Sequence, residues 1–257
     1  MFKSLALTAG LLASQAAAHG YLSTVTLDGT THQAYNPGQP TSSGIGWSFT
    51  ATDEGPVKDI YHPDLVCRQD AHPTHNHGPV SRGGTVSFHW TSDDKQLNPY
   101  GWAPSHKGPI MTYIAPCPHG DCVNLDKSAL RWTKIDHKGL VAGPASDAGY
   151  WATDALRDNG GVDTISLPAS IAPGNYVLRH ELVALHKAHE WEPEFYPQCV
   201  NIRITGQPGG DDLGASGVPA RELYRHGDPA LYGFDLHREG AEAYYNVPGP
   251  WVYGQGH

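Results

Sequence analysis

Glycine and proline interrupt this chain so often that long regular helices are excluded. The 257 residues include 30 glycines and 21 prolines, and both residue types weaken or end helices. Between the breaks lie short segments with strand character, each bounded by turn-forming residues: 21–29, 84–91, 109–116, 130–136, 163–168, 174–186 and 199–206. This pattern predicts an all-β fold, a β-sandwich.

Two long connections and a long tail accompany these segments. The connections run from Thr30 to Arg82 and from Lys138 to Asp163. Loops of that size in a compact domain usually form functional surfaces. Residues 207–257 lack strand alternation but keep Trp251 and several tyrosines, so we expect this tail to wrap onto the domain. The length excludes a second module, and no internal repeat is present.

The first eighteen residues have the features of an export signal. Lys3 supplies the positive charge, residues 5–13 the apolar core, and Ala16–Ala18 the small-residue cleavage site. The apolar run is too short to span a bilayer. We therefore predict a signal peptide over residues 1–18, a single catalytic domain over residues 19–257, and a secreted, extracellular protein whose mature chain begins at His19.

The four cysteines agree with export, because an even number in an oxidising compartment favours disulfides. Cys117 and Cys122 are close enough to close one small loop, which leaves Cys67 to pair with Cys199. The alternative is a zinc site that combines Cys67 with nearby histidines, although the spacing fits no common zinc finger. These histidines are His72, His75 and His77.

The charge pattern excludes several classes of partner. The formal net charge is −9, and the acidic residues are scattered. Without a basic stripe, binding to nucleic acid or to an anionic membrane is disfavoured. No Asn-x-Ser/Thr acceptor is present, so N-glycosylation is not expected.

A histidine at the mature N-terminus offers two nitrogen ligands, its α-amine and its ring. A third nitrogen would complete a planar set that favours Cu(II) and leaves positions open for oxygen chemistry. Sixteen histidines are present, so spacing alone cannot choose the third ligand. The candidates are His106, just before a predicted strand, and His180 and His186, which lie six residues apart on one segment. Tyr196 is a further candidate because Cys199 lies close to it.

Seven motifs then occur in the order found in one known family. They are HGYLSTVTLDG directly after the signal, WSFTATDEG, PVSRGGTVSFHW, SHKGPIMTYIAPC, IAPGNYVLRHELVALH, FYPQC and YNVPGPWVY. Together they cover nearly the whole mature chain. On these motifs the chain resembles the fungal lytic polysaccharide monooxygenases of auxiliary activity family nine, once filed among glycoside hydrolases.

The resemblance implies an immunoglobulin/fibronectin-III-like β-sandwich with long loops and a flat, copper-bearing face. It implies that one copper ion is held by His19, His106 and an axial Tyr196. It also implies that His186 hydrogen-bonds oxygen species at the metal, and that Cys67 pairs with Cys199 and Cys117 with Cys122.

The chain departs from the family pattern at two places. Glu194 stands two residues before Tyr196, where the family commonly has Gln. Gln can donate an N–H, whereas an ionised Glu only accepts, so we expect Glu194 to act protonated or the oxygen species to be managed differently. The family often places a sugar-stacking tyrosine near Leu236 or His237. The other aromatic candidates for substrate contact are Tyr253, Tyr35 and Trp47.

We therefore predict a copper-dependent monooxygenase or peroxygenase that cleaves β-1,4-glucan at C1, C4 or both, with cellulose as the expected substrate. The expected co-substrates are O₂ or H₂O₂ and an external electron donor, such as cellobiose dehydrogenase or a small reductant, and the protein is expected to be a monomer. The main alternative is a non-catalytic copper-binding protein of the same fold. A copper-independent carbohydrate-binding module and a conventional glycosidase, which would need paired carboxylates, are the other two.

Overall fold

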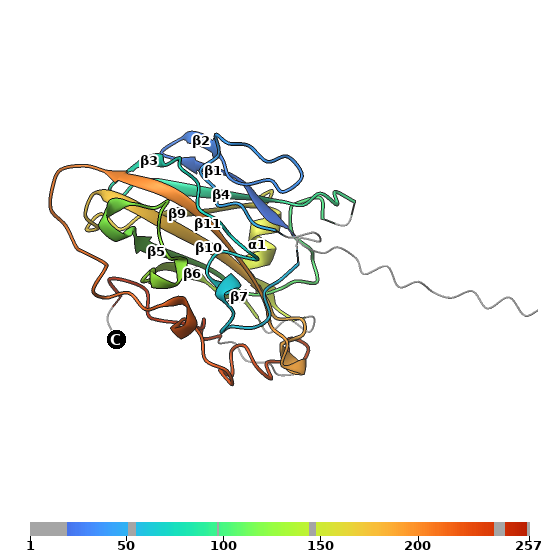
Figure 1. Cartoon of the computed structure of the whole chain (residues 1–257). Helices are drawn as coiled ribbons and strands as arrows, with labels where there is room; N and C mark the ends of the chain where they lie inside the picture. Colours follow the sequence, from blue (N-terminus) through green and yellow to red (C-terminus); the bar gives the residue numbers. More distant parts are fainter. Residues whose placement is uncertain (1–19, 51–54, 97, 144–147, 239–244, 256–257) are drawn as a thin grey trace, which may run out of the picture.

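Two packed β-sheets form the body of the protein (Figure 1). The structure is a computed structural model that describes residues 20–50, 55–96, 98–143, 148–238 and 245–255. The predicted β-sandwich is confirmed. One sheet has the strand order β2-β1-β4-β9, the other has the order β3-β11-β10-β5-β6, and β7 pairs with β8 in a small ribbon. The strands are β1 (Tyr21–Leu27), β2 (Thr30–Gln33), β3 (Gly78–Ser81), β4 (Thr85–Thr91), β5 (Ile110–Pro116), β6 (Thr133–Lys138), β7 (Leu140–Ala142), β8 (Tyr150–Trp151), β9 (Val162–Ser166), β10 (Gly174–Ala184) and β11 (Glu194–Thr205).

Alternating side chains join the two sheets. Val86, Phe88 and Trp90 of β4 are buried, while the residues between them are more exposed, because successive side chains of a strand point to opposite faces. They pack in one cluster with side chains of the five-stranded sheet such as Ile114 and Leu178. This cluster is the core between the sheets.

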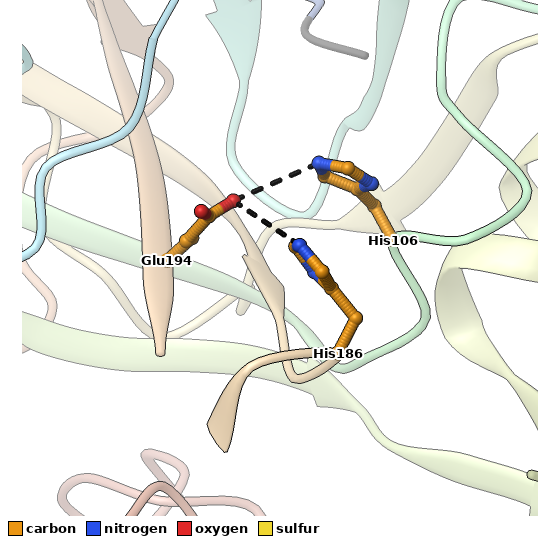
Figure 2. A group of neighbouring side chains, drawn as sticks. All are labelled: His106, His186 and Glu194. Carbon is orange, nitrogen blue, oxygen red and sulfur yellow. Dashed lines mark ion pairs between the residues drawn. The ribbon is translucent and has the colours of Figure 1, made fainter. Parts of the chain in front are cut away.

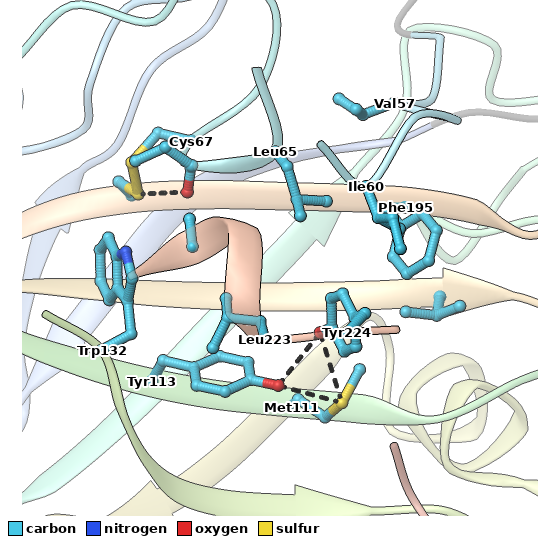
Figure 3. Close-up of a cluster of buried hydrophobic side chains, with 14 of the residues drawn as sticks. Val57, Ile60, Leu65, Cys67, Met111, Tyr113, Trp132, Phe195, Leu223 and Tyr224 are labelled. Atoms are coloured by element: carbon cyan, nitrogen blue, oxygen red, sulfur yellow. Dashed lines mark hydrogen bonds between the residues drawn. A yellow bond between two sulfur atoms is a disulfide. The ribbon is translucent and has the colours of Figure 1, made fainter. Parts of the chain in front are cut away.

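The five-stranded sheet is buried on its second face as well. Along β5, Ile110 and Ile114 belong to the core between the sheets, whereas Met111 and Tyr113 belong to a second apolar cluster. Figure 3 shows part of this second cluster, where the hydroxyls of Tyr113 and Tyr224 both point toward the Met111 sulfur. Burial on both faces explains why nearly every residue of β5, β10 and β11 is buried, and why β5 is apolar along almost its whole length.

The chain after Thr205 covers that second face. It lies beyond the five-stranded sheet, on the side away from β1 and β2 (Figure 1). Val218 and Trp132 exchange two backbone hydrogen bonds of 2.7 and 3.0 Å, and the Tyr253 N–H donates to the Lys134 carbonyl at 2.7 Å. Leu223 is fully buried in the second cluster. The C-terminal residues therefore contribute to the core.

A buried ion pair lies within this covered face. Arg179 and Glu181 of β10 are both fully buried and form a bidentate pair of 2.8 and 2.5 Å. Burial opposes the charge on Arg179, but Glu181 more than compensates, and the pKa of Arg179 is raised. The Arg179 guanidinium also donates to the carbonyls of Leu65 and Val66. The pair thus ties β10 to the long connection between β2 and β3.

The two long connections contain more regular structure than the sequence predicts. The region 138–163, predicted as a loop, contains β7, β8 and the helix α1 (Ala152–Asp158). Here the Asp154 carboxylate accepts the Trp151 N–H at 2.9 Å and supports the first turn of the helix. β2 and β3 add short strands to the connection 30–82, and five 3-10 turns occur: η1 (Pro63–Leu65), η2 (Pro118–Gly120), η3 (Lys127–Ala129), η4 (Ala188–Glu190) and η5 (Ala220–Glu222). None of the helices in these described ranges has the length and apolar character needed to cross a bilayer.

Both predicted disulfides are confirmed. Cys67 is bonded to Cys199 of β11, and Cys117 is bonded to Cys122. The alternative zinc site is wrong, because the sulfur of Cys67 is used in a disulfide and cannot act as a thiolate ligand. His72 instead lies 3.2 Å from the Asp70 carboxylate at the surface.

Candidate metal centre

Three strands bring the candidate residues to one edge of the five-stranded sheet. His106 lies four residues before β5, His186 lies two residues after β10, and Glu194 is the first residue of β11. Leu182 of β10 pairs with Ile110 of β5. Two residues further along β10, Ala184 pairs with Glu194 of β11. Strand pairing therefore places side chains that are distant in sequence next to one another.

The three side chains form a compact group (Figure 2). His106 Nε2 lies 3.6 Å and His186 Nε2 3.9 Å from the same Glu194 oxygen, Oε2. The two imidazole rings are tilted by 31°, with centroids 4.2 Å apart. One ligand atom from each residue lies within 4.8 Å of the others. His106 and Glu194 are buried, whereas His186 is partly exposed. The group is therefore reachable from solvent on the His186 side.

Tyr196 belongs to the same centre. It follows Glu194 by two residues on β11, so both side chains point to one face of the strand. The Tyr196 hydroxyl donates to Glu194 Oε2 at 2.8 Å, and its fully buried ring lies edge-on against Trp102 with centroids 4.8 Å apart. The phenol oxygen is thus held beside the carboxylate and the imidazoles.

His106 is oriented by its own connection. Ser105 Oγ lies 3.0 Å from His106 Nδ1, and Trp102 Nε1 donates to the His106 carbonyl at 2.8 Å. When Nδ1 carries the ring proton and donates a hydrogen bond to Ser105, Nε2 is unprotonated and its lone pair points toward Glu194. This is the tautomer that a ligand at Nε2 requires.

Nitrogen and oxygen donors of this kind fit copper. Imidazole suits Cu(II), and two imidazoles with a phenol and a carboxylate form a donor set without sulfur. His106, His186 and Glu194 could each hold the ion in the geometry found here. His19, the predicted bidentate ligand, lies outside the described residues.

The residue next to His19 is tightly fixed. The Gly20 carbonyl accepts a hydrogen bond of 3.1 Å from the buried Arg68 guanidinium. A Cβ atom on Gly20 would lie 2.3 Å from the Gly101 carbonyl oxygen and 2.9 Å from that of Thr91. Only glycine fits at such a close backbone approach. Arg68 also lies over the Tyr196 ring, 5.6 Å from its centroid, so one side chain contacts both the start of the described chain and the centre.

His180 is not brought to the centre, although it shares β10 with the sequence that leads to His186. It is fully buried, accepts a hydrogen bond of 3.0 Å from Trp90 Nε1, and places its other nitrogen 3.2 Å from Asp163. Burial lowers the pKa of His180, and its neutral ring completes a hydrogen-bonded network between the sheets. The position of His180 gives no support to its role as a metal ligand.

The aromatic candidates for substrate contact lie elsewhere. The Tyr253 hydroxyl is 2.7 Å from Ser170 Oγ and also bonds to Asp211, near the end of the sandwich where β10 begins. Glu194 lies at the opposite end of the β10–β11 pair. Tyr35 packs edge-on against Phe49 at 5.2 Å, and Trp47 is buried and donates to Asn201. His237 is exposed and Leu236 is buried.

Sequence analysis missed four residues around the centre. Trp102 and Ser105 orient His106, Arg68 contacts Tyr196, and Lys58 Nζ lies 3.9 Å from Glu194 Oε1. The spacing of Trp102 and Ser105 just before His106 was a visible signal. Arg68 and Lys58 approach only through the fold of the long connection.

Comparison with known proteins gives consistent matches. The model of the family described as Auxiliary Activity family 9 (formerly GH61) matches residues 19–245. AA9 family lytic polysaccharide monooxygenase E of Aspergillus tamarii is 40% identical over 98% of both chains. AA9 family lytic polysaccharide monooxygenase B of Aspergillus fumigatus is 40% identical over 95% of this chain and 96% of its own.

Solved structures agree with these matches. The extended catalytic domain of H. jecorina LPMO9A superposes with a TM-score of 0.80 at 35% identity and covers 92% of this chain and 91% of its own. A cellulose-active polysaccharide monooxygenase from M. thermophila superposes with a TM-score of 0.76 at 26% identity, over 91% and 99% of the two chains. The similarity thus extends over nearly the whole fold.

Proposed function

This chain belongs to auxiliary activity family 9, and on that premise we propose that it is a cellulose-active enzyme that holds one copper ion through His19, His106 and Tyr196. The members of the family are lytic polysaccharide monooxygenases, whose function is the copper-dependent oxidative cleavage of polysaccharides. The finer assignment is β-1,4-glucan as substrate, with attack at C1, C4 or both. A solved relative described as cellulose-active supports that substrate.

One observation carries the proposal. His106 lies far in the sequence from His186, Glu194 and Tyr196, yet the four meet at one end of the sheet, with the donor atoms of the histidines and Glu194 within 4.8 Å of one another. The anchoring of Gly20 by Arg68, which contacts Tyr196, supports His19 as the remaining ligand. The family match begins at His19, which supports cleavage of a signal peptide after Ala18 and export of one catalytic domain.

Each residue at the centre has a defined task. His106 presents Nε2 because Ser105 holds Nδ1. His186, partly exposed and 4.2 Å from the His106 ring, can donate a hydrogen bond to a substrate oxygen that enters from solvent. Glu194 accepts a hydrogen bond from the Tyr196 hydroxyl and so orients the phenol. When bound, copper supplies the one-electron chemistry by which O₂ or H₂O₂ hydroxylates a sugar carbon, after which the glycosidic bond is lost.

Among the described residues, Glu194 is the one carboxylate of this group, whereas a conventional glycosidase would use a pair of carboxyl groups. We propose that the electrons come from an external donor, such as cellobiose dehydrogenase or a small reductant. We further propose that the enzyme is secreted and acts as a monomer.

The test is a reductant-dependent assay of the mature, copper-loaded protein on amorphous cellulose. Mass spectrometry should find oligosaccharides ending in aldonic acids or 4-keto sugars, and His106→Ala should yield none. If oxidised products are absent with every donor while copper still binds, the protein is a non-catalytic copper binder of the same fold. Unoxidised sugars released without reductant would indicate a glycosidase.

Glu194→Gln should raise the Cu(II)/Cu(I) reduction potential. A carboxylate beside the ion favours Cu(II), and Gln removes that charge while keeping the shape of the side chain. A tenfold change in relative affinity for the two oxidation states corresponds to about 59 mV for one electron, and we expect a rise of that order by redox titration. Glu192→Gln is the matched control, because Glu192 also pairs with Lys58, at 3.0 Å, but is exposed. Equal potentials for Glu194→Gln and wild type would remove Glu194 from the electrostatics of the centre.

A further inference from the structure

Three of the most exposed large apolar side chains lie on one stretch of the surface. Within the described ranges, the large hydrophobic residues with the greatest exposure are Tyr61, Tyr100, Val141, Trp191 and Trp251, at 53 to 66%. Tyr61 and Trp251 line the same groove, which has a volume of about 620 Å³. Trp191 continues this surface toward the metal centre, as its contacts show. Exposed aromatic surface gathered in this way marks an interaction site.

Trp191 lies on the turn that connects His186 with Glu194. Its ring packs against His226 and Tyr232 with centroids 5.7 and 5.8 Å away. The Tyr232 N–H in turn donates to the Asp228 carbonyl at 2.8 Å, and Asp228 lines the groove together with Tyr61. The aromatic side chains therefore follow one another from the metal centre to the groove. We call Trp191, Tyr61 and Trp251 the aromatic strip.

The backbone of Trp191 is held in an unfavourable conformation. Its φ of +64° lies in the left-handed region, which bulky side chains rarely adopt. The Trp191 N–H bonds to the Ala188 carbonyl at 3.0 Å and the Glu192 N–H bonds to the Lys187 carbonyl at 3.1 Å, which keeps the turn in place. Strained residues of this kind cluster at ligand sites. Here the strain presents an indole ring that is 54% exposed.

The polar residues of the groove favour a neutral ligand. Arg221, Glu222, Arg225 and Asp228 line it, two positive and two negative side chains, and Arg221 lies 3.9 Å from Glu222. A balanced set of donors and acceptors suits hydroxyl groups rather than an anion or a cation, and the aromatic faces suit the apolar faces of sugar rings. A site with a few polar groups among aromatic side chains is typical of small-ligand recognition.

We propose that the aromatic strip binds a neutral β-glucan chain at a second site, beside the metal centre and extending away from it over the C-terminal segment. This inference rests on the proposed function, which makes polysaccharide the substrate. The strip would hold the protein on the glucan while His106 and its neighbours act on another part of the same chain or on an adjacent chain.

Binding of copper-free protein to amorphous cellulose tests the strip separately from the oxidation chemistry. In a depletion isotherm, Trp251→Ala should lower the partition coefficient roughly fivefold, and the triple replacement of Tyr61, Trp191 and Trp251 by Ala more than tenfold, since truncated interface tryptophans are among the most costly losses. Tyr100→Ala is the control, because Tyr100 is 53% exposed and lies outside the strip. It should change the coefficient less than twofold.

Melting temperatures of the variants establish that they fold. A folded triple variant that binds like wild type, or an equal loss for Tyr100→Ala, would overturn the inference. If wild-type protein binds through the strip but gives no oxidised products, the proposed function fails and the strip stands.

An independent observation concerns Arg68. Its side chain is fully buried, its guanidinium lies 4.9 Å from the Phe49 centroid and 5.6 Å from that of Tyr196, and it donates to the Gly20 carbonyl. It follows Cys67, which is bonded to Cys199. We infer that Arg68 is a positioning residue that fixes the start of the mature chain relative to Tyr196.

The backbone at Arg68 is itself fixed. Its φ of +89° lies in the left-handed region, and its N–H donates to the Asp64 carbonyl at 2.7 Å. The disulfide on one side and this turn on the other hold the guanidinium in place. The Gly20 carbonyl, which accepts from this guanidinium, is therefore held at a fixed distance from the Tyr196 ring.

Arg68→Met keeps the length of the side chain but removes its donors. We expect Cu(II) binding to weaken roughly tenfold by calorimetry, within the range typical of an outer-shell partner, and the electron paramagnetic resonance spectrum to change. Arg68→Lys should recover part of the affinity. Arg82→Met is the matched control, because Arg82 also donates to backbone carbonyls, those of Ala169, Gln207 and Gly209. If Arg68→Met lowers only the melting temperature, as the control does, with affinity and spectrum unchanged, Arg68 has no positioning role.

Discussion

One additional residue before His19 should weaken copper binding at least about 100-fold. The extension turns the α-amine into an amide nitrogen, which removes one ligand and the chelate that it forms with the ring of the same residue. A free α-amine has a pKa of about 7.7–8, so a metal can displace its proton near neutral pH, whereas an amide offers no comparable donor. Loss of an outer-shell partner alone costs about 10–100-fold, and loss of a direct ligand should exceed that.

Titration calorimetry with Cu(II) measures this effect. The control carries the same added residue after His257, and its affinity should stay within about twofold of wild type. His106, His186 and Glu194 could still hold an ion weakly in the extended protein, because their ligand atoms are gathered without His19. Unchanged affinity in the N-terminally extended protein would contradict the role of the amine.

The second large effect is on stability. Glu181→Gln should lower the free energy of unfolding by about 3–5 kcal/mol, since removing one partner of a buried pair leaves an uncompensated charge. Arg179 would then remain buried with its positive charge, and Tyr224 would lose the carboxylate to which its hydroxyl donates. Burial and then Glu181 raise the pKa of Tyr224, so this hydroxyl stays a donor throughout the usable pH range.

Urea denaturation of the copper-free, disulfide-bonded protein measures the loss. Glu222→Gln is the control, because Glu222 also lies next to an arginine, at 3.9 Å, but both side chains are exposed. Its effect should be close to zero, as for most surface pairs. Replacing Arg179 and Glu181 together with Met and Leu should restore much of the stability. A loss for Glu181→Gln no larger than for the control would show that the pair is dispensable.

The strands that could be predicted were those with strong apolar character. The predicted segments 84–91, 109–116 and 174–186 contain β4, β5 and β10 respectively. β2 and β3 were missed because each has only four residues. The residues of β2 are also polar and mostly exposed. α1 was missed because seven residues carry too little periodicity, and its stability comes from packing and from Asp154.

β11 begins earlier than the sequence indicates. The charged and proline-containing residues 194–198 resemble a loop, yet they continue the strand back to Glu194. Pro197 is accommodated because the ladder with β3 covers only Ile202–Thr205, so β10 is its strand neighbour there. This early start is what places Glu194 and Tyr196 at the centre.

The centre itself could be predicted only in part. Sixteen histidines gave no way to select His106 and His186 by spacing, and the choice depended on family motifs. Contacts made by Arg68 and Lys58 depend on how a connection of some fifty residues folds back on the sheet, which no local pattern in the sequence encodes.

That long connection is fixed at one internal point. Cys67 is bonded to β11, and the carbonyls of the two preceding residues accept from Arg179. The connection therefore behaves as two shorter spans, one on each side of the residues anchored to β10 and β11. The entropic cost of closing each span depends only weakly on its length. Residues added to or removed from either span should therefore change the free energy of folding little. The scaffold thus allows the surface around the metal centre to change while the side chains of the centre keep their places.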